Sequence, residues 1–147
     1  MRAVIQRVSE GSVSVAGEVV GSVGEGMVVL LGVGQNDGDP EVEWMVRKIA
    51  QLRFFEGPDG RMNQSVEDIG GGVLLISQFT LFGNCKKGNR PSFSRAGEPG
   101  MATERFEQVA TGLRARGIRT ETGTFGATMR VSLANEGPVT LLLDSEE

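Results

Sequence analysis

The strongest constraint on the fold is an unbroken apolar run at residues 27–33, which reads Met-Val-Val-Leu-Leu-Gly-Val. A strand with one face in water alternates apolar and polar side chains, whereas a strand that is buried on both faces is apolar throughout. The run therefore predicts a central strand with other layers packed against both of its faces. Residues 73–81 begin in the same way and become polar toward their end.

Shorter β-type segments, separated by turn residues, surround this central strand. The chain has 22 glycines, and many of them fall between the segments. Ala16-Gly17 is expected to close a tight hairpin between residues 12–15 and 18–23. The other predicted strands cover residues 1–9, 120–124, 129–135 and 139–143.

Two segments carry apolar residues at helical spacing. The first begins at Asp39-Pro40, with Asp39 as the predicted N-cap and Pro40 in the first helical position. The second covers residues 101–116 and stops at Gly117. Their apolar stripes consist of Val42, Met45, Val46, Ile49 and Leu52 in the first and of Phe106, Val109, Ala110 and Leu113 in the second.

The predicted architecture is a single α/β domain of mixed sheets over residues 1–147. The length is that of one ordinary domain, and an apolar fraction of 39 % is enough for one core. Two helices cannot cover both faces of a broad sheet, so we expect both on one side with other strands packed behind. A face left uncovered would suit a homodimer.

The chain contains no histidine and no tyrosine, which limits its chemistry. Ser-His-Asp and Cys-His machinery, histidine bases and histidine metal sites are all excluded. An enzyme of this composition must use carboxylates, hydroxyls, amides, backbone groups or the substrate itself. No metal or other cofactor is expected.

The ends and the cysteine content indicate a cytoplasmic protein. Charge interrupts the first residues too early for a signal peptide, and no apolar run approaches the ~20 residues of a membrane span. The single Cys85 has no partner for an internal disulfide. We therefore expect a reducing compartment and no membrane association.

Positive charge gathers in two places, although the net charge is −4. Residues 85–95 hold Lys86, Lys87, Arg90 and Arg95 without an acid, and a second cluster consists of Arg114, Arg116 and Arg119. Such patches can neutralise a few phosphates on an otherwise acidic surface. The alternative is two solvated loops.

Three further features admit both a structural and a functional reading. Ser77-Gln78-Phe79-Thr80 brings polar groups to the end of a core strand, which indicates either bonded polar atoms in a site or a strand emerging into solvent. Residues 135–140, which contain Gly137-Pro138, are compatible with an ordinary turn. Arg7 lies among apolar neighbours and either faces inward, bonding backbone carbonyls, or lies on the outer face.

Two of these segments, Ser77-Gln78-Phe79-Thr80-Leu81 and Asn135-Glu136-Gly137-Pro138-Val139-Thr140, resemble the signature motifs of the D-aminoacyl-tRNA deacylase family. Residues 1–8, 87–93 and 121–127 also resemble family segments, in the same order. The resemblance covers essentially the whole chain.

This resemblance implies a three-layer β/β/α, barrel-like fold and a two-fold homodimer with a site at each end of its interface. Ser77, Gln78, Phe79 and Thr80 would line the pocket of one subunit, and Gly137-Pro138, joined by a cis bond, would enter from the other. The carbonyls of that pair would hold the substrate's amino group, so that an L side chain clashes with the same backbone. Supporting roles fall to Arg7, Asn135, Thr140 and Met129, and tRNA contacts to Lys86, Lys87 and Arg90.

The implied reaction hydrolyses the ester between tRNA and a D-amino acid or glycine. Backbone N–H groups near Gln78, Phe79 and Thr80 would stabilise the oxyanion, and the 2′-hydroxyl of the terminal adenosine would assist the attack of water. Thr80 as a covalent nucleophile is a weaker alternative, because no base in the sequence is placed to activate it. Two other hypotheses are a non-enzymatic tRNA- or RNA-binding dimer and a small esterase acting on free esters.

Overall fold

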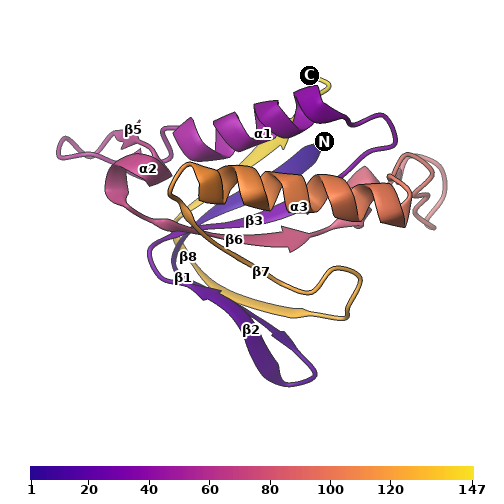
Figure 1. Ribbon diagram of the computed structural model, residues 1–147, viewed down its shortest axis with the longest axis horizontal. Helices are drawn as coiled ribbons and strands as arrows, with labels where there is room; N and C mark the ends of the chain where they lie inside the picture. The colour runs from indigo at the N-terminus through magenta and orange to yellow at the C-terminus, as the bar shows by residue number, and fades with distance from the viewer.

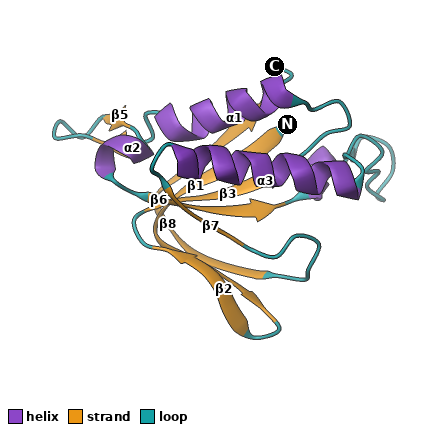
Figure 2. Ribbon diagram, in the orientation of Figure 1, coloured by secondary structure: helices purple, strands orange, loops and turns teal.

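Two long helices cover one face of a strongly curled sheet in the computed structural model, which describes residues 1–147 (Figures 1 and 2). Helices α1 (Asp39–Gln51) and α3 (Pro99–Ala115) lie side by side in the upper layer. The sheet lies beneath them, and part of it folds under to form a third layer. The predicted arrangement, with both helices on one side and strands behind, is confirmed.

The main sheet has six strands in the order β2-β1-β3-β6-β7, with β8 paired to the long β1. β3 runs parallel to β6 and β6 parallel to β7, whereas β1 is antiparallel to β2, β3 and β8. The strands are β1 (Arg2–Val15), β2 (Glu18–Val23), β3 (Gly26–Gly32), β6 (Gly72–Ser77), β7 (Arg119–Thr122) and β8 (Arg130–Asp144), with β4 (Phe55–Glu56) and β5 (Met62–Gln64) in a separate small sheet.

The two most apolar strands, β3 and β6, are buried on both faces. Met27 and Val73 face a core cluster shared with α1 and α3, while Val28 and Leu74 face a second, smaller cluster on the other side. This confirms the interpretation of the unbroken apolar runs. The two clusters form the hydrophobic cores between the three layers.

The sheet curls because β2 turns toward β6 and β7, which gives the fold its barrel-like lower half. Gly26 and Gly72 pair at the start of β3 and β6, where a side chain on Gly26 would overlap the carbonyl oxygen of Gly72. Residue 26 must therefore be glycine, because the backbones of β3 and β6 come too close here for a side chain. The hairpin predicted at Ala16-Gly17 joins β1 to β2, and both residues have positive φ.

The helix starts differ in detail from the prediction. The N-cap of α1 is Gly38 rather than Asp39, and its N–H donates to a Glu41 carboxylate oxygen at 2.8 Å. This hydrogen bond is the main cause that lowers the pKa of Glu41. Asp39 instead accepts from Arg105 of α3 at 2.8 Å, so its carboxylate joins the two helices.

Helix α3 starts at a proline and stops before a glycine. α3 begins at Pro99, two residues before the predicted start, with Glu98 as its N-cap, and ends before Gly117, which has φ +81. No helix in the protein is both long and apolar enough to cross a bilayer.

Several element boundaries were wrong in the sequence prediction. Residues 1–9 and 12–15 form one strand, β1, and residues 130–144 form one strand, β8, because each pairs along nearly its full length with the other. The strand predicted over residues 73–81 ends at Ser77, and Phe79–Phe82 form a 3₁₀ helix, η1. The short helix α2 (Val66–Ile69), held by reciprocal bonds between Ser65 and Asp68, was not predicted.

Candidate active site

A cleft of about 280 Å³ opens where β6 ends. Its lining contains no titratable side chain: it consists of Leu31, Ile76, Ser77, Gln78, Phe79, Phe125, Gly126, Ala127, Met129 and Val131. The residues of the cleft walls therefore cannot supply an ionisable general acid, general base or nucleophile. The cleft can act only through hydroxyl, amide and backbone groups.

The backbone at this end of β6 presents two free donors. The N–H of Gln78 donates to the Leu31 carbonyl at 2.8 Å, which extends the β3–β6 ladder by one bond. Phe79 and Thr80 begin η1, and the first N–H groups of a helix have no intrahelical acceptor. No loop, cap or side-chain hydrogen bond of the chain uses these two N–H groups. Of the three donors expected from the sequence, Gln78 is thus occupied, and Phe79 and Thr80 remain.

The side chains of Gln78 and Thr80 bond to each other. The Gln78 amide donates to the Thr80 hydroxyl; Thr80 is exposed, and Gln78 is half-buried in the cleft wall. The hydroxyl has no carboxylate, amine or imidazole among its hydrogen-bond partners. Thr80 therefore lacks the base that a covalent nucleophile needs.

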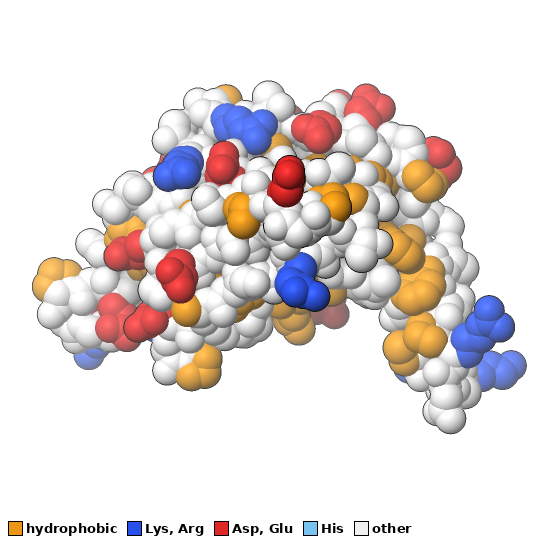
Figure 3. Space-filling view, turned by 90° about the horizontal axis from the view of Figure 1, so that it is seen from below, with side chains coloured by type: hydrophobic (Ala, Val, Ile, Leu, Met, Phe, Trp, Pro, Cys, Tyr) orange, Lys and Arg blue, Asp and Glu red, His pale blue; other side chains and the backbone are white.

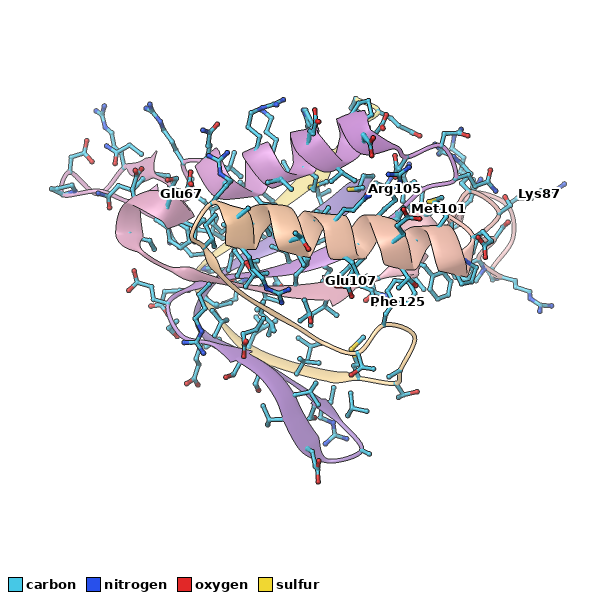
Figure 4. The ribbon with its side chains drawn as sticks, in the orientation of Figure 1. Glu67, Lys87, Met101, Arg105, Glu107 and Phe125 are labelled. Atoms are coloured by element: carbon cyan, nitrogen blue, oxygen red, sulfur yellow. The ribbon has the colours of Figure 1, made fainter.

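The opposite wall of the cleft comes from the segment after β7. Phe125 points up toward α3, where its ring packs edge-on against Phe106 with centroids 5.9 Å apart (Figure 4). Met129 lines the same wall and packs against the smaller core cluster. Met129, which the family resemblance gave a supporting role without a location, thus lies with Ser77 and Gln78. Phe125 fell within a segment that carried the family resemblance, but its place in the wall was not anticipated.

A basic loop borders the cleft. The loop spans residues 84–92, closed by a pair of hydrogen bonds between Asn84 and Ser92, and its Lys86, Lys87 and Arg90 are exposed. Phe93 at its base packs edge-on against Phe79, with ring centroids 5.3 Å apart. In Figure 3 positive side chains stand at the right-hand tip of the molecule, the end at which Lys87 is labelled in Figure 4.

The second predicted basic cluster has a structural role instead. Arg114 donates twice to the Thr120 carbonyl, and Arg116 forms a two-pronged ion pair with Glu67 of α2. The hydrogen bond to Glu67 is the main cause that raises the pKa of Arg116. Arg119 alone in this cluster forms neither an ion pair nor a side-chain hydrogen bond.

A second constellation surrounds Gly137-Pro138, whose peptide bond is cis. The pairing of β8 with β1 is interrupted here, because residues 136–139 stand opposite Arg7 alone. Arg7 is 9 % exposed and faces inward: its Nε donates to the Glu136 carbonyl at 3.0 Å and its Nη1 to the Phe54 carbonyl at 3.3 Å. Gly137 has φ +125, and a side chain on it would lie 2.9 Å from the Arg7 guanidinium.

Asn135 and Thr140 close the base of this loop. The Asn135 amide donates to the Thr140 hydroxyl at 3.1 Å and its carbonyl oxygen accepts from the Val139 N–H at 3.2 Å. Gly137 and Pro138 themselves are exposed at the tip. The loop is therefore held from both sides while its apex faces outward.

The two constellations lie far apart within one chain. Arg7 pairs with Met27 of β3, and Met27 pairs with Val73 at the start of β6, whereas Ser77 is four residues further along. At ~3.3 Å per residue this separates the Gly137-Pro138 loop from Ser77 by roughly 13 Å along the strands. One chain brings Ser77, Gln78, Phe79 and Met129 together, but it does not bring Gly137 and Pro138 to them.

The chain thus has an α/β fold with a cleft that lacks ionisable groups and lies next to two unpaired backbone N–H groups. No set of three His, Cys, Asp or Glu side chains comes together to hold a metal. Residues 4–144 match the model of the family described as D-Tyr-tRNA(Tyr) deacylase. The chain belongs to this family, which is a family of hydrolases.

Relatives and solved structures agree with this assignment. The chain is 54 % identical over 147 residues to the D-aminoacyl-tRNA deacylase of Desulfitobacterium hafniense (strain DSM 10664 / DCB-2), covering 100 % of this chain and 99 % of the relative. It is 53 % identical to the D-aminoacyl-tRNA deacylase of Thermus aquaticus, covering 100 % and 97 %.

Two solved structures share the fold. One, described as c-Myc DNA Unwinding Element Binding Protein, has a TM-score of 0.92 and 42 % identity and covers 99 % of each chain. The other, described as a probable eukaryotic D-amino acid tRNA deacylase, has a TM-score of 0.83 and 20 % identity and covers 97 % of each chain. The predicted β/β/α, barrel-like fold is confirmed.

Proposed function

We propose that this protein hydrolyses the ester bond between tRNA and a D-amino acid or glycine. The observation that carries the proposal is the cleft at the end of β6, whose walls hold no titratable group and which Phe79, the first of two residues with unpaired N–H donors, lines. An aminoacyl ester is already activated, so that backbone stabilisation can supply much of the required catalysis. Family membership and full-length relatives named D-aminoacyl-tRNA deacylase support the same reaction.

In the proposed mechanism the substrate carbonyl oxygen points at the N–H groups of Phe79 and Thr80. Water adds to the carbonyl carbon, and negative charge develops on that oxygen within reach of both donors. Each donor of this kind contributes about 2.7–4 kcal/mol in measured oxyanion holes. The ester C–O bond then breaks, the ribose oxygen takes a proton, and the products are free amino acid and tRNA.

The substrate supplies the proton relay in this proposal. The 2′-hydroxyl of the terminal adenosine lies next to the ester and can orient the attacking water, a task for which the cleft walls offer no ionisable group. The same feature argues against an acyl-Thr80 intermediate, since the Thr80 hydroxyl bonds only to the Gln78 amide.

Selectivity in this proposal comes from a second copy of the chain. The Gly137-Pro138 loop lies at the opposite end from its own Ser77, and its apex is exposed. In a two-fold homodimer it enters the partner's cleft, its carbonyls hold the substrate's amino group, and an L side chain meets the loop backbone. Glycine, having no side chain, passes. Exposed apolar residues on β8, Leu141 at 37 % and Leu142 at 77 %, are suited to burial between copies.

We place the tRNA contacts of the basic loop at Lys86, Lys87 and Arg90, because their side chains are exposed beside the cleft and have no acidic partner. The reaction belongs in the cytoplasm, where aminoacyl-tRNA is used. The free, exposed Cys85 is compatible with a reducing compartment.

A second candidate function is nucleic-acid binding without hydrolysis. It is favoured by the 42 % identical structure whose description is that of a DNA-binding protein. Such a module would bind charged and uncharged tRNA alike and release no amino acid.

One assay separates these functions. The protein is incubated with D-Tyr-tRNA and with L-Tyr-tRNA, and the loss of each ester is followed. Rapid loss of the D form alone is the expected result. Binding without ester loss would favour the second candidate, and equal loss of both forms would contradict the proposed selectivity.

A further inference from the structure

The arginines of this chain divide into those that are bonded within the protein and those that are not. Arg2, Arg7, Arg95, Arg105 and Arg116 each form an ion pair with an acid. Arg47 and Arg53, together with Lys48, form no ion pair and no hydrogen bond, and all three are exposed. These three residues at the end of α1 are called the α1 basic cluster below.

The α1 basic cluster surrounds a hollow of about 350 Å³ that is lined by Arg47, Lys48, Gln51, Leu52 and Arg53, without an acid. Lys48 also lies over the ring of Trp44, 5.9 Å from its centroid, which directs its chain along the helix. The pKa of Asp68 is lowered mainly by its hydrogen bonds with Ser65, and the positive charge of Arg53 lowers it further. A concave surface with three unpaired cations is suited to a ribose-phosphate backbone.

The place of the α1 basic cluster in the fold decides which site it can serve. Arg53 directly precedes Phe54, whose carbonyl accepts from Arg7, and Arg7 also holds the carbonyl of Glu136 beside Gly137. The cluster therefore lies at the Gly137-Pro138 end of the chain. Figure 1 shows α1 ending beside α2, at the left, whereas β6 ends at the right.

We infer that the α1 basic cluster binds backbone phosphates of the tRNA whose aminoacyl end occupies the partner subunit's cleft. This inference rests on the proposed function, in which the Gly137-Pro138 loop enters that cleft. Because the cluster is fixed to the same end as the loop, it comes to the partner's cleft with it. Each tRNA is then held by the basic loop of one subunit and the α1 basic cluster of the other.

The test compares two substrates that share the reacting ester. The variant Arg47→Gln/Lys48→Gln/Arg53→Gln is measured on D-Tyr-tRNA and on the 3′-D-tyrosyl ester of adenosine, which has no phosphate. On the tRNA, kcat/KM should fall about tenfold at low salt, and the slope of log kcat/KM against log salt should flatten by about 2. On the adenosine ester kcat/KM should not change.

Single substitutions give a matched control. Arg53→Gln should weaken tRNA hydrolysis, whereas Arg119→Gln, which removes another exposed and unpaired charge, on β7, should not. An unchanged salt slope in the triple variant, an equal loss on both substrates, or equal effects of the two single variants would each overturn the inference. Failure of the unaltered protein to cleave the adenosine ester would instead contradict the proposed function.

Mixed dimers test the assignment to the partner subunit. One copy carries Phe79→Pro, which removes an N–H donor and silences its own cleft, and the two copies carry different affinity tags. The only working cleft then belongs to the second copy. Neutralising the α1 basic cluster on the silenced copy should reduce tRNA hydrolysis, and neutralising it on the working copy should not. The reverse pattern would show that the cluster acts on its own cleft.

Discussion

The two ends of the central sheet satisfy their polar groups in opposite ways. At the end of β6 the N–H groups of Phe79 and Thr80 have no acceptor, and Phe79 lines the cleft. At the other end Arg7, Asn135 and Thr140 bond the base of the Gly137-Pro138 loop, so that only its apex is open. The first end is suited to stabilising charge in a reaction, and the second to presenting rigid backbone. Each end holds half of the proposed site.

Removing a donor from the first end should have the largest effect. Phe79→Pro deletes one unpaired N–H at the first position of η1, where proline fits the helix start. Hydrolysis of D-Tyr-tRNA should fall by about 10²–10³ in kcat. Phe79→Ala is the matched control, since it removes the ring and keeps the N–H. If both variants lose activity equally, the ring rather than the donor is responsible.

Distorting the loop at the second end should have the next largest effect. In Gly137→Ala the added methyl group would lie 2.9 Å from the Arg7 guanidinium, on a residue with φ +125, so the loop must move. A displacement of ~1 Å in a positioning group costs about 10²-fold in rate. The unfolding midpoint should also fall, because alanine strains a backbone with φ +125 and crowds Arg7. If the variant keeps full activity and the same ratio of D-Tyr-tRNA to L-Tyr-tRNA hydrolysis, the loop is not part of the site.

Arg7→Ala should affect stability as well as the loop. It removes charged hydrogen bonds to the carbonyls of Phe54 and Glu136, and the free energy of unfolding should fall by about 2–4 kcal/mol. We expect kcat/KM to fall about tenfold as the loop loosens. Arg116→Ala is the control, since its pair with Glu67 is on the surface and is worth about 0–1 kcal/mol. Urea denaturation measures both variants, and equal losses would refute the bracing role of Arg7.

Thr80→Ala should have the smallest effect. It removes a hydroxyl that bonds to the Gln78 amide but keeps the backbone N–H. We expect kcat to change by less than about threefold if the donor is the backbone group. Complete loss of activity together with a trapped acyl-enzyme would restore the covalent route.

The sequence predicted the layers better than the connections between them. The unbroken apolar runs of β3 and β6 and the apolar stripes of α1 and α3 depend on burial, which periodicity reports directly. The end of β6 was predicted four residues too late, because Phe79–Phe82 are apolar enough to continue a strand and leave the ladder only through tertiary contacts. β8 was divided at Gly137-Pro138 because the residues look like a turn, while the pairing with β1 resumes beyond the loop.

The candidate site was predictable in its parts but not in its arrangement. Ser77 to Thr80 and Gly137-Pro138 stand out as polar or turn residues, and the resemblance to a family assigned them to one site. Nothing in their spacing shows that they lie at opposite ends of the sheet, nor that the Gln78 N–H is already bonded to Leu31. The sequence also could not show that Arg47 and Arg53 form no ion pair, because ion pairing depends on which acidic side chains the fold brings near.

Mixing two inactive variants provides the most direct test of a site built from both ends. Copies carrying Phe79→Pro are allowed to exchange subunits with copies carrying Gly137→Ala, in equal amounts. If each cleft takes its loop from the partner, half of the dimers are mixed and one of their two clefts is intact, so D-Tyr-tRNA hydrolysis should rise to about a quarter of the unaltered rate. A mixture no more active than its separate components, despite complete exchange, would contradict the account.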